Sequence, residues 1–202
     1  MIEMLGVALG LGALAGVNLY MTVFVTGLAL RLGWLDLLTG YSELEVLANP
    51  WVLGISGVLF LLEACADKVP WVDSAWDVVH TVIRPVGGVL LAMGALGQLD
   101  PALTVVAGLL TGGTSLITHT AKAGTRAMIN LSPEPVSNLV ASTAEDTFVL
   151  GGLSLVALAP MPAFFVFLVV VVIAAIVVWK TSRFLVRGWQ RLRQRGVVRA
   201  DG

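Results

Sequence analysis

Six long apolar stretches dominate the chain, and short segments rich in proline, glycine, asparagine and charge separate them. The stretches cover residues 4–32, 51–67, 76–98, 102–127, 136–158 and 162–182. A helix needs about 20 residues to cross the hydrocarbon core of a bilayer, within a range of about 17–25. The pattern therefore predicts an all-α, polytopic membrane protein with about six transmembrane helices. The first and fourth stretches are longer and rich in glycine, so we expect these two to be tilted, bent or broken.

The overall composition supports this interpretation. Hydrophobic residues make up 57% of the 202 residues and charged residues only 12%, whereas a soluble chain of this length would need an unusually large core. The formal net charge of −1 gives no reason to expect a nucleic-acid partner. Two Gly-x-x-x-Gly pairs in the first stretch favour close helix contact; they are formed by Gly6, Gly10, Gly12 and Gly16.

Basic residues gather near one end of the chain, in a tail that contains Arg183, Arg187, Arg191, Arg193, Arg195 and Arg199. Segments rich in lysine and arginine face the cytoplasm. With six spans, the segments around Lys68 and Arg126 would lie on the same side as the tail. The sequence therefore predicts a single transmembrane domain at 1–182, a cytoplasmic tail at 183–202, and both termini on the cytoplasmic side.

An internal repeat is a further hypothesis. The segment that starts at Gly16 and reaches Gly27 aligns with the segment from Gly113 to Gly124 at the same spacing. Each segment would belong to a unit of three spans, at 1–98 and 102–182, so the two units would be inverted in the membrane. Inverted repeats with broken helices and a site near the bilayer midplane are typical of transporters.

The first of two charged windows lies between the second and third stretches. Glu63 and Asp67 are four residues apart and share a helix face. The next helix carries a polar stripe at intervals of three and four residues, which consists of Asp73, Asp77, His80 and Arg84. Pro85 follows inside the helix and is expected to kink it.

The second window carries more positive charge at the same spacing, with Ser115, His119, Lys122 and Arg126. A connector with two prolines follows and must be partly non-helical; it contains Asn130, Ser132, Pro133, Glu134 and Pro135. The fifth stretch then carries polar groups on one face, with one acidic residue adjacent to that face: Asn138, Ser142, Glu145 and Asp146.

The motifs from Glu63 to Pro85 and from His119 to Asn138 resemble a family of small bacterial membrane proteins known as domain of unknown function 4126. The resemblance implies a multi-pass protein of the bacterial inner membrane and brings no activity. The segment from Glu63 to Lys68 also has a looser likeness to the Glu-x-Gly-Asp-Lys signature of inverted-repeat cation and proton exchangers. Here the spacing differs by one residue and the glycine is missing, so no ligand geometry carries over.

A charge in the hydrocarbon core costs about 2.5–3.5 kcal/mol on insertion scales, so charged groups normally line a bundle interior, a water-filled cavity or a transport path. We therefore expect the charged side chains to meet in one cytoplasm-facing basin. The favoured hypothesis is a transporter or channel-like protein for a small ion or polar anion. Movement of this substrate could be coupled to the movement of protons. The acidic groups would hold a cation or protons, the basic groups would balance them or bind an anion, and the two histidines would relay protons.

Two other functions stay open. The protein could handle lipids, with the basic groups binding a lipid phosphate at the inner leaflet and the protein either flipping the lipid or acting on its headgroup. Alternatively, the charges could be internal ion pairs of a scaffold. Glu63, Asp67 and Asp77 are weak candidates for a divalent-metal site. No enzymatic motif is present and no cofactor is expected. The bilayer is the expected partner, and a homodimer is compatible with so small a bundle.

Overall fold

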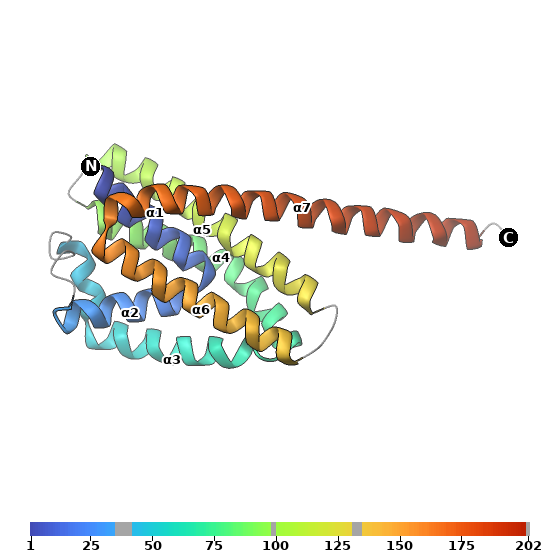
Figure 1. Cartoon of the computed structure of the whole chain (residues 1–202), viewed down its shortest axis with the longest axis horizontal. Coiled ribbons are helices and arrows are strands. Elements are labelled where there is room, and N and C mark those ends of the chain that lie inside the picture. The colour runs from blue at the N-terminus through green and yellow to red at the C-terminus, as the bar shows by residue number, and fades with distance from the viewer. Residues whose placement is uncertain (35–41, 98–99, 131–134, 201–202) are drawn as a thin grey trace.

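The computed structural model describes residues 1–34, 42–97, 100–130 and 135–200, and these ranges contain helices and no strand. Figure 1 shows the helices gathered in one bundle from which the last helix projects. The elements in chain order are α1 (Ile2–Val17), α2 (Leu19–Arg31), the short 3₁₀ helix η2 (Ser42–Ala48), α3 (Pro50–Ala66), α4 (Pro70–Leu96), α5 (Pro101–Ile129), α6 (Pro135–Leu158) and α7 (Pro160–Ala200).

Four helices, α4 to α7, are long enough and apolar enough to cross a membrane. They coincide with the last four predicted stretches, and α3, with 17 residues, coincides with the second. Each helix from α3 to α7 begins with a proline, at the position where the missing N–H needs no partner. The all-α class is confirmed, and the long apolar helices agree with a membrane protein. The count of six spans is not confirmed, because the first stretch is built differently.

That first stretch forms two helices that meet at Asn18. Asn18 is extended, with φ −148° and ψ 97°, and its side-chain oxygen accepts a hydrogen bond from the Met21 amide at 2.9 Å, as an N-cap does. Figure 1 shows α1 ending inside the bundle and α2 running back toward the end where the chain begins. With 16 and 13 residues, each is shorter than a crossing helix needs. The two helices therefore form a hairpin that enters the bundle and leaves it again at the same end of the bundle.

The two chain termini lie at opposite ends of the molecule (Figure 1). Helix α7 starts near the N-terminal end, runs past the other helices and continues to Ala200. The predicted basic tail is helical from 183 to 200 and continues α7. The Arg183 guanidinium lies 4.4 Å from the centre of the Trp179 ring, which is a cation–π contact.

Helix α1 occupies the centre of the bundle, and every residue from Gly10 to Gly16 is buried. A helix that is apolar all round belongs in an interior. Gly6 lies against the Pro160 carbonyl of α7, and Gly16 lies against the Ser115 carbonyl of α5. These glycines permit the close helix contact that their spacing predicts.

The inverted repeat is not confirmed. The segment from Gly16 to Gly27 contains the break at Asn18, whereas the segment from Gly113 to Gly124 lies inside the continuous helix α5. The two aligned segments therefore differ in local structure. Helix α4 continues through Pro85 to Leu96, with the proline in the helix interior where the kink is predicted.

Asn18→Ala should destabilise the protein by about 1–2 kcal/mol, the upper part of the range for a lost N-cap, because the Met21 amide would lose its acceptor in a buried position. Asn49 caps α3 in the same way through the Trp51 amide at 2.9 Å, but this cap is exposed to solvent. Asn49→Ala is therefore the matched control and should cost less. Thermal unfolding in detergent would compare the two variants, and an equal loss would contradict the expectation.

Candidate functional site

Nine charged side chains from α3, α4, α5 and α6 form one network near the bundle end where α3 and α5 finish. Seven of the nine are buried, and the two on α6 are half-buried. We refer to the following residues as the ionic network: Glu63, Asp67, Asp73, Asp77, Arg84, Lys122, Arg126, Glu145 and Asp146.

Arg84 joins α4 to three other helices. Its Nη2 contacts Glu63 Oε1 on α3 at 2.5 Å, and its Nη1 donates to the Gly16 carbonyl at the end of α1 at 2.9 Å. The same Nη1 lies 3.0 Å from His119 Nδ1 on α5. The backbone carbonyl of Arg84 accepts a hydrogen bond from the Ser115 hydroxyl at 2.9 Å. Side chain and backbone of this residue are therefore both held in place.

Lys122 lies at the centre of the acidic groups. Its Nζ is 3.5 Å from Glu63, 3.4 Å from Asp67 and 3.3 Å from Glu145. It also donates to the Val17 carbonyl at 3.2 Å. A single ammonium group thus connects α5 to α3, α6 and the end of α1.

Arg126 binds Glu145 through two parallel hydrogen bonds, from Nε and Nη2, each 2.8 Å long. This bidentate geometry is the strongest form of arginine–carboxylate pair. Arg126 also contacts Asp67 Oδ2 at 3.4 Å and the side-chain oxygen of Asn138 at 3.3 Å. The pair links the end of α5 to the middle of α6.

The break between α1 and α2 forms the inner limit of the network. The carbonyls of Gly16 and Val17, which have no partner within α1 at its final turn, accept from Arg84 and Lys122. Cations at the C-terminal end of a helix also compensate the negative end of its dipole. Asn18 donates to Asp146 Oδ1 at 3.4 Å, midway along α6. The charged groups therefore extend from one end of the bundle to its middle.

The two histidines have different hydrogen-bonding roles. His80 Nδ1 lies 2.8 Å from the Trp76 carbonyl and must carry a proton, so Nε2 accepts from the Tyr20 hydroxyl at 3.0 Å. His119 Nδ1 faces Arg84, which only donates, so Nε2 carries the proton toward the Asp77 carbonyl at 3.1 Å. A second proton on His119 would face the guanidinium. Of the two predicted relays, only His80 keeps a nitrogen that can accept a proton.

The network holds six carboxyl groups and three basic groups, an excess of three acidic side chains. The basic groups surround Glu63, Asp67 and Glu145, whereas Asp77 reaches only Arg84, at 4.0 Å. Asp73 accepts from Asn130 at 3.1 Å. Neither Asp73 nor Asp146 lies within 4 Å of a basic group among the described residues. Of these three carboxyl groups, Asp77 has one distant basic partner and the other two have none within this limit.

Several buried polar atoms keep unused hydrogen-bonding capacity. Within the described ranges, Glu63 Oε2, Asp73 Oδ1, Arg84 Nε and Asn138 Nδ2 have no hydrogen-bond partner. Buried polar groups are normally paired; here the two carboxylate oxygens can each accept one further hydrogen bond, and Arg84 Nε and Asn138 Nδ2 can each donate one. A cavity of about 450 Å³ between α5, α6 and α7 reaches Lys122 and Glu145 from the side.

The structure brings together most of the residues that the sequence analysis selected. His80 and His119 adjoin the ionic network, and Asn138 and Ser142 are buried on α6. Asn130 ends α5 and Pro135 starts α6, while Ser132, Pro133 and Glu134 lie outside the described residues. The groups are enclosed by neighbouring helices, in place of the open basin that we expected. In the described chain no three His, Cys, Asp or Glu side chains are placed to hold a metal ion, so the metal candidates gain no support.

Sequence reasoning missed three parts of the site: the Asn18 break with its carbonyls, the Tyr20 hydroxyl, and Thr81, whose hydroxyl lies 3.2 Å from His119 Nε2. Asn18 follows a run of small and apolar residues, and an isolated asparagine inside such a run is an N-cap signal. Tyr20 and Thr81 carry no comparable signal, because only the packing brings them to the histidines.

The helices and their buried ionic network define a multi-pass α-helical membrane protein. Residues 5–180 match the domain of unknown function named DUF4126, and the chain belongs to this family. The likeness that the two charged windows carry is thereby confirmed. No curated protein and no solved structure matches the chain.

Proposed function

We propose that this protein transports a small ion across the bacterial inner membrane and that the ionic network takes up protons during transport. The observation that carries the proposal is a buried network with three surplus carboxyl groups, which ends at an interrupted helix in the middle of the bundle. Charges inside a membrane bundle mark ion and proton pathways. Interrupted helices whose ends face the site are a feature of transporters.

The helix arrangement supports a topology with five crossings, by α3 to α7, and a re-entrant hairpin formed by α1 and α2. Irregular backbone at membrane depth is tolerated where protein covers it, and Asn18 is only 2% exposed. The bundle end that holds Lys68 and the basic part of α7 then faces the cytoplasm. The N-terminus faces the other side, which differs from the sequence-based expectation of two cytoplasmic termini.

Protons suit the surplus carboxyl groups better than a metal ion, because the described side chains lack metal-binding geometry. A proton can be shared between Asp73 and Asp77, which lie four residues apart on α4. From this region His80 Nε2 and the Tyr20 hydroxyl continue the chain of exchangeable protons toward the other half of the bundle.

Proteoliposomes that contain the protein and a pH-sensitive dye should report a pH change when one of Na⁺, K⁺, Li⁺ or Cl⁻ is imposed as a gradient. Asp77→Asn should reduce this signal to the level of empty liposomes, because it removes an uncompensated acid without breaking a close ion pair. Asp100→Asn is the matched control, since Asp100 is an exposed N-cap of α5 and asparagine caps equally well. A wild-type signal equal to that of empty liposomes, or a signal that Asp77→Asn leaves unchanged, would reject the proposal.

A scaffold function is the second candidate, and the complete set of ion pairs around Lys122 and Arg126 favours it. In that case no imposed gradient changes the dye signal, and Asp77→Asn stabilises the fold because it relieves charge repulsion. A lipid-phosphate site has less support, since each of the three basic groups already contacts at least two carboxyl groups.

A further inference from the structure

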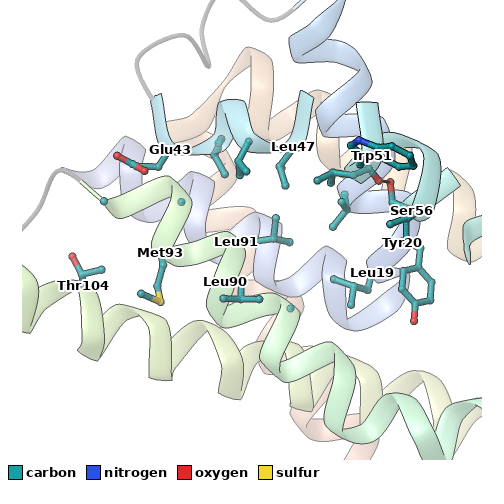
Figure 2. Close-up of a pocket in the computed structure, with 18 of the residues that line it drawn as sticks. Leu19, Tyr20, Glu43, Leu47, Trp51, Ser56, Leu90, Leu91, Met93 and Thr104 are labelled. Carbon is teal, nitrogen blue, oxygen red and sulfur yellow. Dashed lines mark hydrogen bonds between the residues drawn. The ribbon is translucent and has the colours of Figure 1, made fainter. Parts of the chain in front are cut away.

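A second cavity, of about 1070 Å³, lies in the other half of the bundle, between α2, η2 and α3 on one side and α4 and the start of α5 on the other. Figure 2 shows its apolar floor, which includes Leu19, Leu90 and Leu91, and its few polar groups. This volume is at the upper end of ordinary ligand pockets. None of the nine ionic-network residues lines it, so it is a separate feature of the fold.

Three glycines at the α4 side of the cavity allow side chains of α2 and η2 to approach α4 closely. Gly87, Gly94 and Gly97 all line the cavity, and no side chain extends from α4 at these positions. Leu19 and Leu44 pack directly against two of them. Helix α3 packs mainly on α2 and makes few contacts with α4, so the space between α3 and α4 stays open toward the membrane.

The rim of the opening is apolar and exposed. Trp51, Ile55, Leu90 and Val105 are 80%, 59%, 63% and 59% exposed, and all of them line the cavity. In a membrane-spanning bundle such side chains contact lipid acyl chains. The cavity is therefore open to the hydrocarbon, and the molecules that can enter it laterally are membrane lipids.

The polar groups lie at the two ends of the cavity and differ in kind. At the inner end, the Tyr20 hydroxyl is bonded to His80 and the Ser56 hydroxyl donates to the Val52 carbonyl at 2.6 Å. Both are satisfied, so this end suits a methyl-terminated chain. At the outer end lie Thr104 and Glu43 (Figure 2). The Glu43 carboxylate is exposed and has no ion pair or hydrogen bond among the described residues.

We propose that this cavity binds an amine-headed phospholipid, with one acyl chain between α3 and α4 and the ammonium group beside Glu43. Van der Waals packing of the acyl chain against the apolar lining stabilises the bound lipid, because lipid tails are as apolar as leucine and the transfer from the bilayer has no hydrophobic driving force of its own. The unpaired carboxylate supplies headgroup selectivity, because a cation is attracted and a purely anionic headgroup is repelled. The lipid belongs to the leaflet on the side of η2.

Native mass spectrometry of the full chain in detergent, with phosphatidylethanolamine or phosphatidylglycerol added, tests the proposal. The wild type should retain one phosphatidylethanolamine molecule in preference to phosphatidylglycerol. Ile55→Trp should abolish retention, because the larger side chain fills the cavity. Leu61→Trp is the matched control on the same helix: Leu61 is 63% exposed and lies outside the cavity, so retention should persist.

Glu43→Gln should remove the preference for phosphatidylethanolamine while retention of both lipids continues. Equal binding of the two lipids by the wild type, or equal loss of lipid in Ile55→Trp and Leu61→Trp, would overturn the proposal. The measurement needs no ion flux, so it stands or falls independently of the proposed transport function.

Discussion

Arg84→Met should destabilise the protein by about 3–5 kcal/mol, the cost of breaking a buried ion pair by removing one partner. The substitution leaves the Glu63 carboxylate, which is 0% exposed, with only the more distant Lys122. It also removes the donor to the Gly16 carbonyl at the end of α1. Unfolding in mixed micelles of a mild detergent and sodium dodecyl sulfate would measure the loss.

The double variant Arg84→Met with Glu63→Gln provides the control. Because it removes both charges of the pair, it should recover a large part of the stability that Arg84→Met loses. With the single variant Glu63→Gln it completes a double-mutant cycle, which gives the coupling energy of the pair. If the loss in Arg84→Met stays below about 1 kcal/mol, the usual limit for an exposed pair, the ion pair is not a structural centre of the network.

Gly16→Ala should cost about 3 kcal/mol, the upper end of the range for overpacking. A methyl group at this position would overlap the Thr118 hydroxyl and the Ser115 carbonyl oxygen. The carbonyl is part of the α5 backbone and cannot rotate away. Helix α1 would have to move, and with it the two carbonyls that accept from Arg84 and Lys122.

Gly113→Ala is the matched control, because no atom lies within 4 Å of a methyl group placed there. It should stabilise α5 by about 0.5–1 kcal/mol, since alanine is the better residue in a helix interior. Thermal unfolding in detergent would compare the two glycine variants. A similar effect of both substitutions would show that the contact between α1 and α5 is less tight than the structure indicates.

The sequence predicted the last five helices well, for a clear physical reason. A proline lies at or shortly before the start of each of these stretches. Proline is favoured at the first position of a helix and disfavoured in its interior. The predicted starts at 102, 136 and 162 accordingly lie within two residues of the observed starts at Pro101, Pro135 and Pro160, whereas the third stretch was predicted from 76 and its helix begins at Pro70. The i, i+3 and i, i+4 spacings likewise placed Asp77, His80 and Arg84 on one face of α4.

The first stretch was harder to predict, because hydropathy does not distinguish one long span from two short helices that turn back. Asn18 interrupts the helix, and tertiary contacts with Asp146 and the two basic groups stabilise the break. These partners lie more than 60 residues away in the chain. The number of crossings and the side of the N-terminus in the proposed topology both depend on this one turn.

The composition of the charged windows predicted which residues would meet and did not predict how closely they would pair. Spacing along a helix specifies a face, but it does not specify which carboxylate a given cation contacts. Lys122 was expected to balance acids or bind an anion, and in the structure three carboxylates surround it. The surplus of acid, located at Asp73, Asp77 and Asp146, becomes visible only when each pair has been assigned.

The uninterrupted length of α7 has a mechanical consequence. Its 41 residues span about 60 Å at the usual helical rise, roughly twice the hydrocarbon thickness. Near its start, Phe167 packs against α1 at Gly10, while the far part of the helix projects beyond the other helices (Figure 1). Because α7 is one continuous helix, a change in the tilt of its arginine-rich portion would also move its start. That movement would displace α1 and shift the carbonyl groups that hold Arg84 and Lys122.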